Sequence, residues 1–441
     1  MAIPNGSHFL IVCLALIALA PGLRAQVGHT DSAPGGVMVS QAQDVTRPGG
    51  SSRVEASVTG PDAVHNQLTH DGSDKQALFE ERPLQAWLDW KQDLAEATGL
   101  DLGTDYHALA FKASDSPGEN SAASGVLRLY GRWEILGRGT ADTGSLVFKT
   151  ENRDAYNGIP PADMGFELGY VGLLNPVYSD QGARTTNLYW RQSFSNARVI
   201  SYAGFLDSTD YADVYALGSP WTGFSNLVFS TGSATMGGTP DGALGLMVAT
   251  WLSDSVYLVG GMVDANSDPA DLFEGFDTFF SDFETFKSLD IHWTPKRSEI
   301  LLENAHLSLW QVDSRGEAGT NDGYGMSFSA SGMVQGKYLP FLRGGWARDG
   351  GSLLEASVSA GFGYKPTPNG HLLGVGLNWG RPNPDTFGAN LVDQYTAEVF
   401  YRMQIDHALQ LTPSIQVLAN PALNRDEDLI TVLGIHMRLI F

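Results

Sequence analysis

The chain has 441 residues and a formal net charge of −22, yet only 17% of its residues are charged, below the roughly 25% of average soluble domains. Past residue 20, no run reaches the roughly 18 apolar residues that a membrane-spanning helix needs. The negative charge excludes nucleic acid as a partner, because the chain could not neutralise phosphates. Together with 51 glycines and 10% aromatic residues, these features favour a β-barrel with a water-filled lumen.

The amino terminus has the pattern of an export signal. Phe9–Ala20 is an apolar run with the length of a signal-peptide core, and it is too short to cross a bilayer. A small residue, Ala25, follows shortly afterwards, so we predict a signal peptide over residues 1–25 that is cleaved on export. The single cysteine, Cys13, lies inside this run, and the exported chain would therefore contain no thiol.

Two short regions precede the main body of the chain. Residues 26–83 are rich in Gly, Ser, Asp, Thr and Gln and lack apolar periodicity, which predicts a disordered periplasmic extension. Residues 84–104 contain the helical spacing of Leu84–Gly99, with Gly99 as the expected stop. We predict a short periplasmic helix that packs at the mouth of the barrel or plugs part of it. An isolated surface helix is the alternative.

Residues 105–441 have the pattern of β-strands. In Tyr395–Gln404, for example, apolar and polar residues alternate, which places them on opposite faces of a strand. The predicted fold is all-β, a 16-stranded antiparallel transmembrane β-barrel. The strands are expected to start near residues 105, 125, 144, 185, 197, 243, 255, 285, 303, 322, 336, 353, 370, 393, 408 and 428.

Alternation alone also suits a soluble sandwich, but the connections distinguish the two folds. The first, third, fifth and seventh connections are long and the intervening ones short, as in outer-membrane barrels with short periplasmic turns. The long loops that begin near Asp154 and Asp207 are expected to fold inward and narrow the channel. The last strand, Thr431–Phe441, alternates throughout and ends on an aromatic residue, and it resembles the terminal strand of bacterial outer-membrane barrels.

Charged and aromatic side chains recur on the strand faces that are expected to line the lumen. Guanidinium and carboxylate groups hydrogen-bond hydroxyls, and aromatic rings stack on the C–H face of a sugar. This lining suits neutral polyhydroxyl solutes; the alternative is a solvated wall without preference. The candidate substrate-binding residues are Arg128, Arg132, Glu134, Lys149, Glu151, Arg153, Arg191, Trp310, Arg343, Glu398 and Arg402.

Two further patterns bear on whether the chain carries out chemistry. His306 and Ser308 share a strand face, as in an outer-membrane phospholipase, but the lumen side is expected for both, so we predict no catalytic residues and no enzyme. The acidic segment Asp264–Asp290 lacks calcium-loop spacing and is interleaved with phenylalanines. It predicts an extracellular loop with an aromatic anchor. We predict no metal site and no cofactor.

From about Trp87 to Phe441 the sequence resembles the carbohydrate-selective OprB-type porins of Gram-negative bacteria. The resemblance is strongest in three segments, Trp133–Tyr156, Ser219–Ser230 and Asp393–Asp428. In the last of these, the matching positions are Glu398, Tyr401, Arg402, Gln404, Thr412, Pro413 and Gln416, followed by Asn420 and Pro421.

The resemblance implies a passive porin of the cell outer membrane that prefers glucose-like mono- and small oligosaccharides. It also implies a constriction lined by Arg, acidic and aromatic residues, for which the strongest candidates here are Arg132, Glu134, Arg153, Glu398 and Arg402. The expected partners are small neutral sugars, outer-membrane lipid and lipopolysaccharide, and further copies in a homotrimer, with a monomer as the alternative. The alternative function is a general diffusion porin without sugar selectivity.

Overall fold

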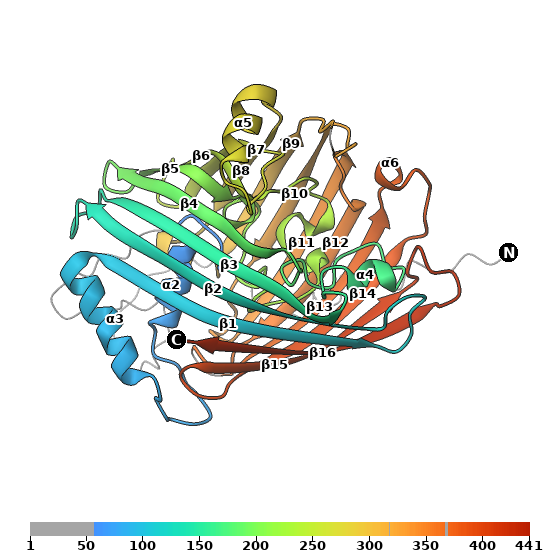
Figure 1. Ribbon diagram of the computed structural model, residues 1–441, viewed down its shortest axis with the longest axis horizontal. Coiled ribbons are helices and arrows are strands. Elements are labelled where there is room, and N and C mark those ends of the chain that lie inside the picture. Colours follow the sequence, from blue (N-terminus) through green and yellow to red (C-terminus); the bar gives the residue numbers. More distant parts are fainter. Residues whose placement is uncertain (1–56, 317, 367–368) are drawn as a thin grey trace, which may run out of the picture. The chain divides into compact units, whose positions relative to one another are not determined.

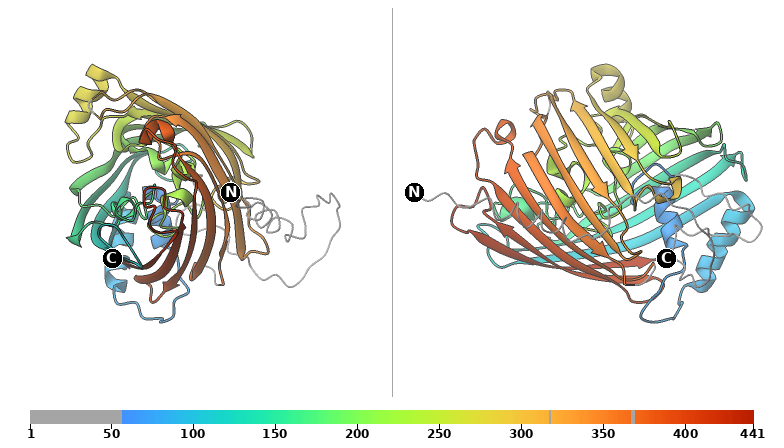
Figure 2. Two further views of the ribbon diagram at one scale, coloured as in Figure 1. Left: turned by 90° about the vertical axis from the view of Figure 1, so that its right-hand side faces the viewer. Right: turned by 180° about the vertical axis from the view of Figure 1, so that it is seen from behind.

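The computed structural model describes residues 57–316, 318–366 and 369–441, so the predicted signal peptide and residues 26–56 lie outside the described residues. Sixteen antiparallel strands close into one barrel, in which sequence neighbours pair and β1 pairs with β16 (Figures 1 and 2). The fold class predicted from sequence is confirmed. The strands are β1 (Leu100–Ala113), β2 (Ser121–Leu136), β3 (Gly144–Gly158), β4 (Gly182–Phe194), β5 (Val199–Asp207), β6 (Asp241–Trp251), β7 (Val256–Asp264), β8 (Thr285–Trp293), β9 (Asn304–Val312), β10 (Gly323–Ser331), β11 (Tyr338–Asp349), β12 (Leu354–Tyr364), β13 (Leu372–Pro382), β14 (Gln394–Gln404), β15 (Leu409–Ala419) and β16 (Leu429–Ile440).

Helices are short and lie before the barrel or in its loops. None in the described ranges is long and apolar enough to cross a membrane. The longest, α3, ends at Gly99, whose left-handed backbone (φ 78°) is the stop expected from sequence. The helices are α2 (Val64–Asp71), α3 (Gln85–Thr98), α4 (Met164–Glu167), α5 (Glu274–Asp277) and α6 (Pro384–Phe387), with single turns η1 (Ser208–Asp210), η2 (Leu227–Phe229), η3 (Thr231–Ala234), η4 (Thr278–Asp282) and η5 (Arg297–Glu299).

The two faces of the strands have the polarity of a membrane barrel. On β16, Leu433 and Ile435 are 55% and 45% exposed on the outer face, whereas Arg438 is buried on the inner face. The same alternation on β8 exposes Leu289 and Ile291. An apolar outside and a polar inside reverse the arrangement of a soluble barrel, because here hydrocarbon is the outer solvent.

The barrel has two different ends. At the terminal end, where β1 starts and β16 stops, the hairpins are short and Lys91 of α3 donates to the carbonyl of Phe441 at 3.2 Å. The opposite end, the loop end, carries three long loops, over residues 159–181, 208–240 and 265–284. Helix α3 therefore lies at the terminal end of the barrel, and it has no buried residue.

Loops 159–181 and 208–240 fold into the lumen, as predicted. They contact one another where the Leu227 N–H donates to the Leu173 carbonyl at 3.0 Å, and the first loop reaches the wall where Gln394 of β14 bonds both backbone groups of Val171. Loop 265–284, which includes α5, lies outside, with Phe273 and Phe280 84% and 72% exposed. The contrast shows that loop length alone does not determine which loops enter the lumen.

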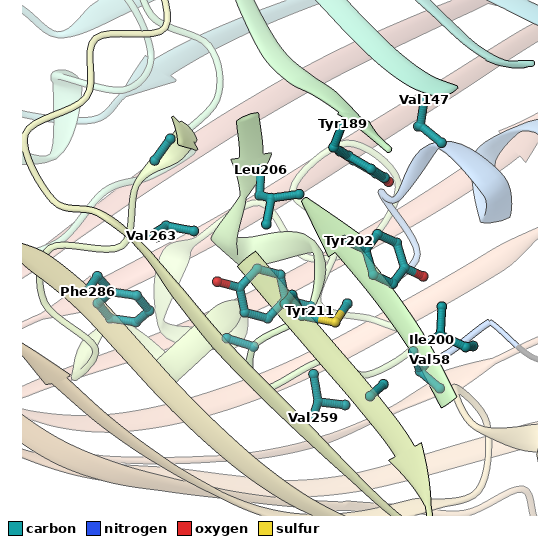
Figure 3. Packing of buried hydrophobic residues seen from close by; sticks show 14 of the residues in the cluster. Val58, Val147, Tyr189, Ile200, Tyr202, Leu206, Tyr211, Val259, Val263 and Phe286 are labelled. Carbon is teal, nitrogen blue, oxygen red and sulfur yellow. The ribbon is translucent and has the colours of Figure 1, made fainter. Parts of the chain in front are cut away.

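Part of the lumen is filled by an apolar cluster (Figure 3). Ile200 and Tyr202 of β5 and Val259 of β7 project inward and pack with Tyr211 of loop 208–240. Val58, from the start of the described chain, joins the same cluster and is fully buried. The lumen wall over β5–β8 thus provides a hydrophobic core for elements that enter the barrel.

Residues 57–83, named the N-terminal segment below, differ from the expectation of disorder. They follow a fixed course that includes α2, which lies against β1, β2 and β3 (Figure 2). The physical reason is that the few apolar residues of this segment, Val58, Val64 and Leu68, are buried against the barrel. Composition describes only the apolar surface that a segment can bury against itself, and here the barrel supplies the rest.

Candidate functional site

The inner wall holds a buried ionic cluster where β1 meets β2 and β16. The carboxylate of Asp105 accepts two hydrogen bonds from Arg128, at 2.8 and 2.6 Å, and one from Nε of Arg438 at 2.8 Å. Asp71 of α2 adds a second carboxylate, 3.0 Å from Arg438 Nη2. This arginine cluster, Asp71, Asp105, Arg128 and Arg438, balances two carboxylates against two guanidinium groups.

An aromatic cluster adjoins it. The guanidinium of Arg128 lies 4.2 Å from the ring centroid of Trp221, which comes from loop 208–240. Tyr178 of loop 159–181 packs against Trp221 at 5.3 Å and bonds His436 of β16 through its hydroxyl at 2.7 Å. His107 of β1 lies 4.9 Å from Trp221. Two loops and two strands therefore bring aromatic faces and a cation together inside the lumen.

A second group of charges lies on β3 and faces loop 208–240. Lys149 Nζ is 3.6 Å from Asp207 and 3.5 Å from Asp210, while Arg153 donates to Glu151 at 2.7 Å. Burial raises the pKa of Asp210 to about 7, despite the attraction of Lys149. These contacts join the base of the loop to the wall.

The middle of the same loop is fixed by Asp213. Its carboxylate accepts a hydrogen bond from His306 of β9 at 2.7 Å. It also forms an ion pair with Arg343 of β11, whose Nη2 donates to it at 2.5 Å. Burial raises the pKa of Asp213, but the Arg343 guanidinium, together with His306 and the Gly232 N–H, outweighs that effect and holds the pKa below its usual range. Asp213 has a left-handed backbone (φ 50°), which Asp tolerates better than most residues. Arg343 also lies 3.9 Å from the ring centroid of Tyr215.

Strand β14 holds the far part of the loop. Both oxygens of Glu398 accept backbone hydrogen bonds, from Ser225 N–H at 2.7 Å and from Asn226 N–H at 2.9 Å. Arg402 donates to the carbonyl of Thr222 at 2.7 Å. Two of the candidate residues therefore position loop 208–240 across the lumen.

The candidate residues from sequence all occupy lumen-side positions, but they do not form one site. Arg132 and Glu134 lie toward the terminal end, and Trp310 is buried with its ring stacked 6.5 Å from Phe286. Arg191 donates to Thr143 at 3.1 Å. Several of these side chains contact the inward-folded loops or the N-terminal segment and do not face open water.

Sequence reasoning missed the residues that complete the clusters. His436 and Arg438 stand on the polar face of the last strand, so their direction was readable, although their partners were not. The loop residues have no periodicity to indicate direction. The missed residues are Asp71, Asp105, His107, Tyr178, Asp210, Asp213, Trp221, His436 and Arg438.

His306 and Ser308 are not arranged as a catalytic base and nucleophile. Nε2 of His306 faces Asp213 and its Nδ1 lies 3.0 Å from Asn304, so neither ring nitrogen is directed at Ser308. Among the residues that the structure describes, no group of His, Cys and acidic side chains could hold a metal ion.

Comparison with known proteins identifies what the chain is similar to. The model of the OprB family, described as carbohydrate-selective porin, matches residues 85–441. The high-pH structure of Pseudomonas putida OprB is similar with a TM-score of 0.67 and 14% identity, over 83% of this chain and 100% of that chain. A mutant of the Rh. blastica porin has a TM-score of 0.48 and 13% identity, over 78% and 100%. No curated protein matches the chain.

Proposed function

This chain belongs to the OprB family of carbohydrate-selective porins, and from that premise we propose how its lumen discriminates between solutes. It is an outer-membrane channel for passive, carbohydrate-preferring diffusion. Its solutes are neutral mono- and small oligosaccharides of the glucose type, and they cross without chemical change. Selectivity arises from the radius and lining of the lumen.

The observation that carries this proposal is the aromatic cluster beside the arginine cluster. The ring centroid of Trp221, a buried indole, lies 4.2 Å from the guanidinium of Arg128 and 5.9 Å from that of Arg153. An indole face stacks on the C–H face of a sugar ring, while guanidinium groups donate to its hydroxyls. A neutral amino acid of smaller size has no such ring to stack.

Glu398 and Arg402 act as positioning residues in this proposal. Through Ser225, Asn226 and Thr222 they hold the stretch of loop that follows Trp221. Weakening either contact changes the position of the indole relative to Arg128, and sugar preference falls without loss of the barrel.

Liposome swelling tests the proposal with glucose, a disaccharide and a smaller neutral amino acid. Glucose is expected to enter faster than the amino acid. Trp221→Leu removes the indole face on which the sugar stacks, and Arg402→Gln weakens the contact that positions the loop. Each is therefore expected to reduce the ratio of the glucose rate to the amino-acid rate. Phe280→Ser, on the exposed outer loop, is the matched control. Rates that follow solute size in every protein would identify a general diffusion porin and contradict the proposal.

We also propose that the chain is a channel and not an enzyme. The orientation of His306 toward Asp213 supports this, because Ser308 then lacks a positioned base. Ser308→Ala is expected to leave solute flux intact. Fatty-acid release from phospholipid that depends on Ser308 would contradict this part of the proposal.

The assembly and export of the chain complete the proposal. The apolar outer face contacts lipid and lipopolysaccharide, and the barrel associates as a homotrimer, with a monomer as the alternative outcome of mass measurement in detergent. Residues 1–25 are removed on export, so amino-terminal sequencing of the mature protein should begin at Gln26.

A further inference from the structure

The N-terminal segment crosses the lumen from loop 208–240 to the terminal end. The Gly60 N–H donates to the Asp210 carbonyl at 2.6 Å, and Ser219 Oγ donates to Asp62 at 2.5 Å. At the other end of the segment, the Leu78 and Phe79 N–H groups donate to the carbonyls of residues 404 and 405, at 3.0 and 2.9 Å. The segment therefore contacts both loop 208–240 and the turn between β14 and β15.

Between those ends, the segment occupies arginines of the wall. Asp71 binds Arg438 and accepts a hydrogen bond from the hydroxyl of Tyr130. Nδ1 of His65 lies 3.0 Å from Arg132 Nη1. With its side-chain oxygen facing Arg128, the Gln67 amide accepts a hydrogen bond from Arg128 Nη1 at 2.9 Å. These side chains present oxygens and a ring nitrogen to the wall, as the hydroxyl oxygens of a sugar would.

The segment is seated by apolar contacts as well as polar ones. Val58 and Val64 are fully buried in the apolar cluster with Tyr202 and Ile200. Burial raises the pKa of Asp71, but Arg438, together with His70 and Lys75, outweighs that effect and holds the pKa well below its usual range. The carboxylate is therefore charged when it pairs with Arg438.

Three observations indicate that the segment can leave while the barrel remains intact. The family match begins at residue 85, so the segment lies outside the part of the chain shared with the family. In the described chain it joins a strand at one end only, through α3, whereas loop 208–240 lies between β5 and β6. Asp105 still pairs with both Arg128 and Arg438 when Asp71 is withdrawn, so departure leaves a net charge of +1 in the cluster but neither arginine without a carboxylate.

We propose that the N-terminal segment is an internal plug that competes with solute for Arg128, Arg132 and Arg438. While it is seated, the lumen is narrowed and these arginines are occupied. When it leaves, sugar hydroxyls take the positions of its oxygens. The assignment of the arginines to sugar rests on the proposed function, whereas the occlusion of the lumen does not.

Ion conductance in planar bilayers without sugar tests the occlusion. A chain lacking residues 57–83 is compared with the full chain, and heat-modifiable electrophoretic mobility establishes that each barrel is folded. Removal of the segment is expected to raise conductance roughly twofold or more, since conductance follows the free cross-section of a pore. Phe280→Ser, far from the segment on the exposed outer loop, is the control that should leave conductance unchanged.

A reversible lock tests displacement. Asp62 and Ser219 already meet, and Cys13, the only native cysteine, lies in the predicted signal peptide. Asp62→Cys with Ser219→Cys therefore allows one disulfide between the segment and loop 208–240. The oxidised protein is expected to stay at low conductance, and a reductant should restore transitions to a higher level.

The outcomes separate the parts of the proposal. Unchanged conductance in a folded deletion variant overturns occlusion. A rise on deletion without any effect of the lock and reductant overturns displacement, and the segment is then a fixed lining. Swelling assays on the full chain and the deletion variant report sugar preference independently, so loss of the proposed function is distinguishable from loss of the plug.

Discussion

Loop 208–240 and the N-terminal segment both enter the lumen and both offer a carboxylate to a buried arginine, but the charges around them differ. Asp213 of the loop faces Arg343, whose described ion pairs involve that carboxylate alone. Asp71 of the segment faces Arg438, which keeps a second partner in Asp105 at 2.7 Å. Removing a buried charge is costly mainly when its partner is left unpaired. The comparison teaches that the loop is part of the folded barrel, whereas the segment is accommodated by a wall whose two arginines keep a carboxylate, Asp105, without it.

The largest effect is expected for Asp213→Asn. The amide keeps the left-handed backbone and can still bond His306 and Arg343, so the change isolates the charge. Arg343 is then buried without a carboxylate, and the free energy of unfolding should fall by about 3–5 kcal/mol. Urea unfolding in lipid vesicles measures it. A loss below about 1 kcal/mol would remove the proposed difference between loop and segment.

The next effect is a pH dependence at the base of the loop. Because the folded pKa of Asp210 is raised from 3.8 to about 7, the folded state binds the proton more tightly than the unfolded state. Its stabilising contribution is present below pH 4 and is lost as pH rises to 7. The loss is at most about 4 kcal/mol, since one pKa unit is worth about 1.4 kcal/mol. Unfolding curves at pH 4.5 and 7.5 should differ less in Asp210→Asn than in the native sequence.

A smaller loss is expected for Asp71→Asn. Arg438 retains Asp105, so the variant forfeits one charged hydrogen bond, about 1.5 kcal/mol. The double variant with Asp105→Asn should lose more than the sum of the single changes, because Arg438 loses both of its carboxylates only in the double variant. Additive losses in the same unfolding assay would show that Asp105 does not compensate for Asp71.

The smallest effect is expected for Ser329→Ala. Ser329 accepts from Arg343 Nη1 at 3.0 Å, and this bond is neutral on the serine side. Arg343 keeps its ion pair with Asp213, so the loss should be about 1 kcal/mol. A loss equal to that of Asp213→Asn would mean that hydrogen bonding rather than charge holds the loop.

The barrel could be predicted because its signal is local and repeated. Alternation of side chains fixes which face of a strand meets lipid, and the alternation predicted for Thr431–Phe441 agrees with the exposed Leu433 and the buried Arg438 of β16. The long loops near Asp154 and Asp207 were identified in the same way, from interruptions of the alternation.

The clusters could not be predicted because their partners come from segments without a period. Asp213 has a left-handed backbone in an irregular loop, and no spacing rule connects it to Arg343. Val58 and Val64 belong to a segment whose composition suggests disorder, and their burial depends on a wall formed by distant strands. Such pairings depend on the closed barrel and are invisible in a linear pattern.

The seam between β1 and β16 bears on the order in which the barrel assembles. Arg438 lies opposite His107 across this seam and donates to Asp105. The first and last strands of the barrel are therefore joined by an ion pair. Until the seam closes, that arginine lacks its wall carboxylate in a medium that penalises bare charge. A slip of one residue would turn it toward hydrocarbon. The Asp105–Arg438 ion pair therefore stabilises the closed barrel only when β1 and β16 pair in the correct register.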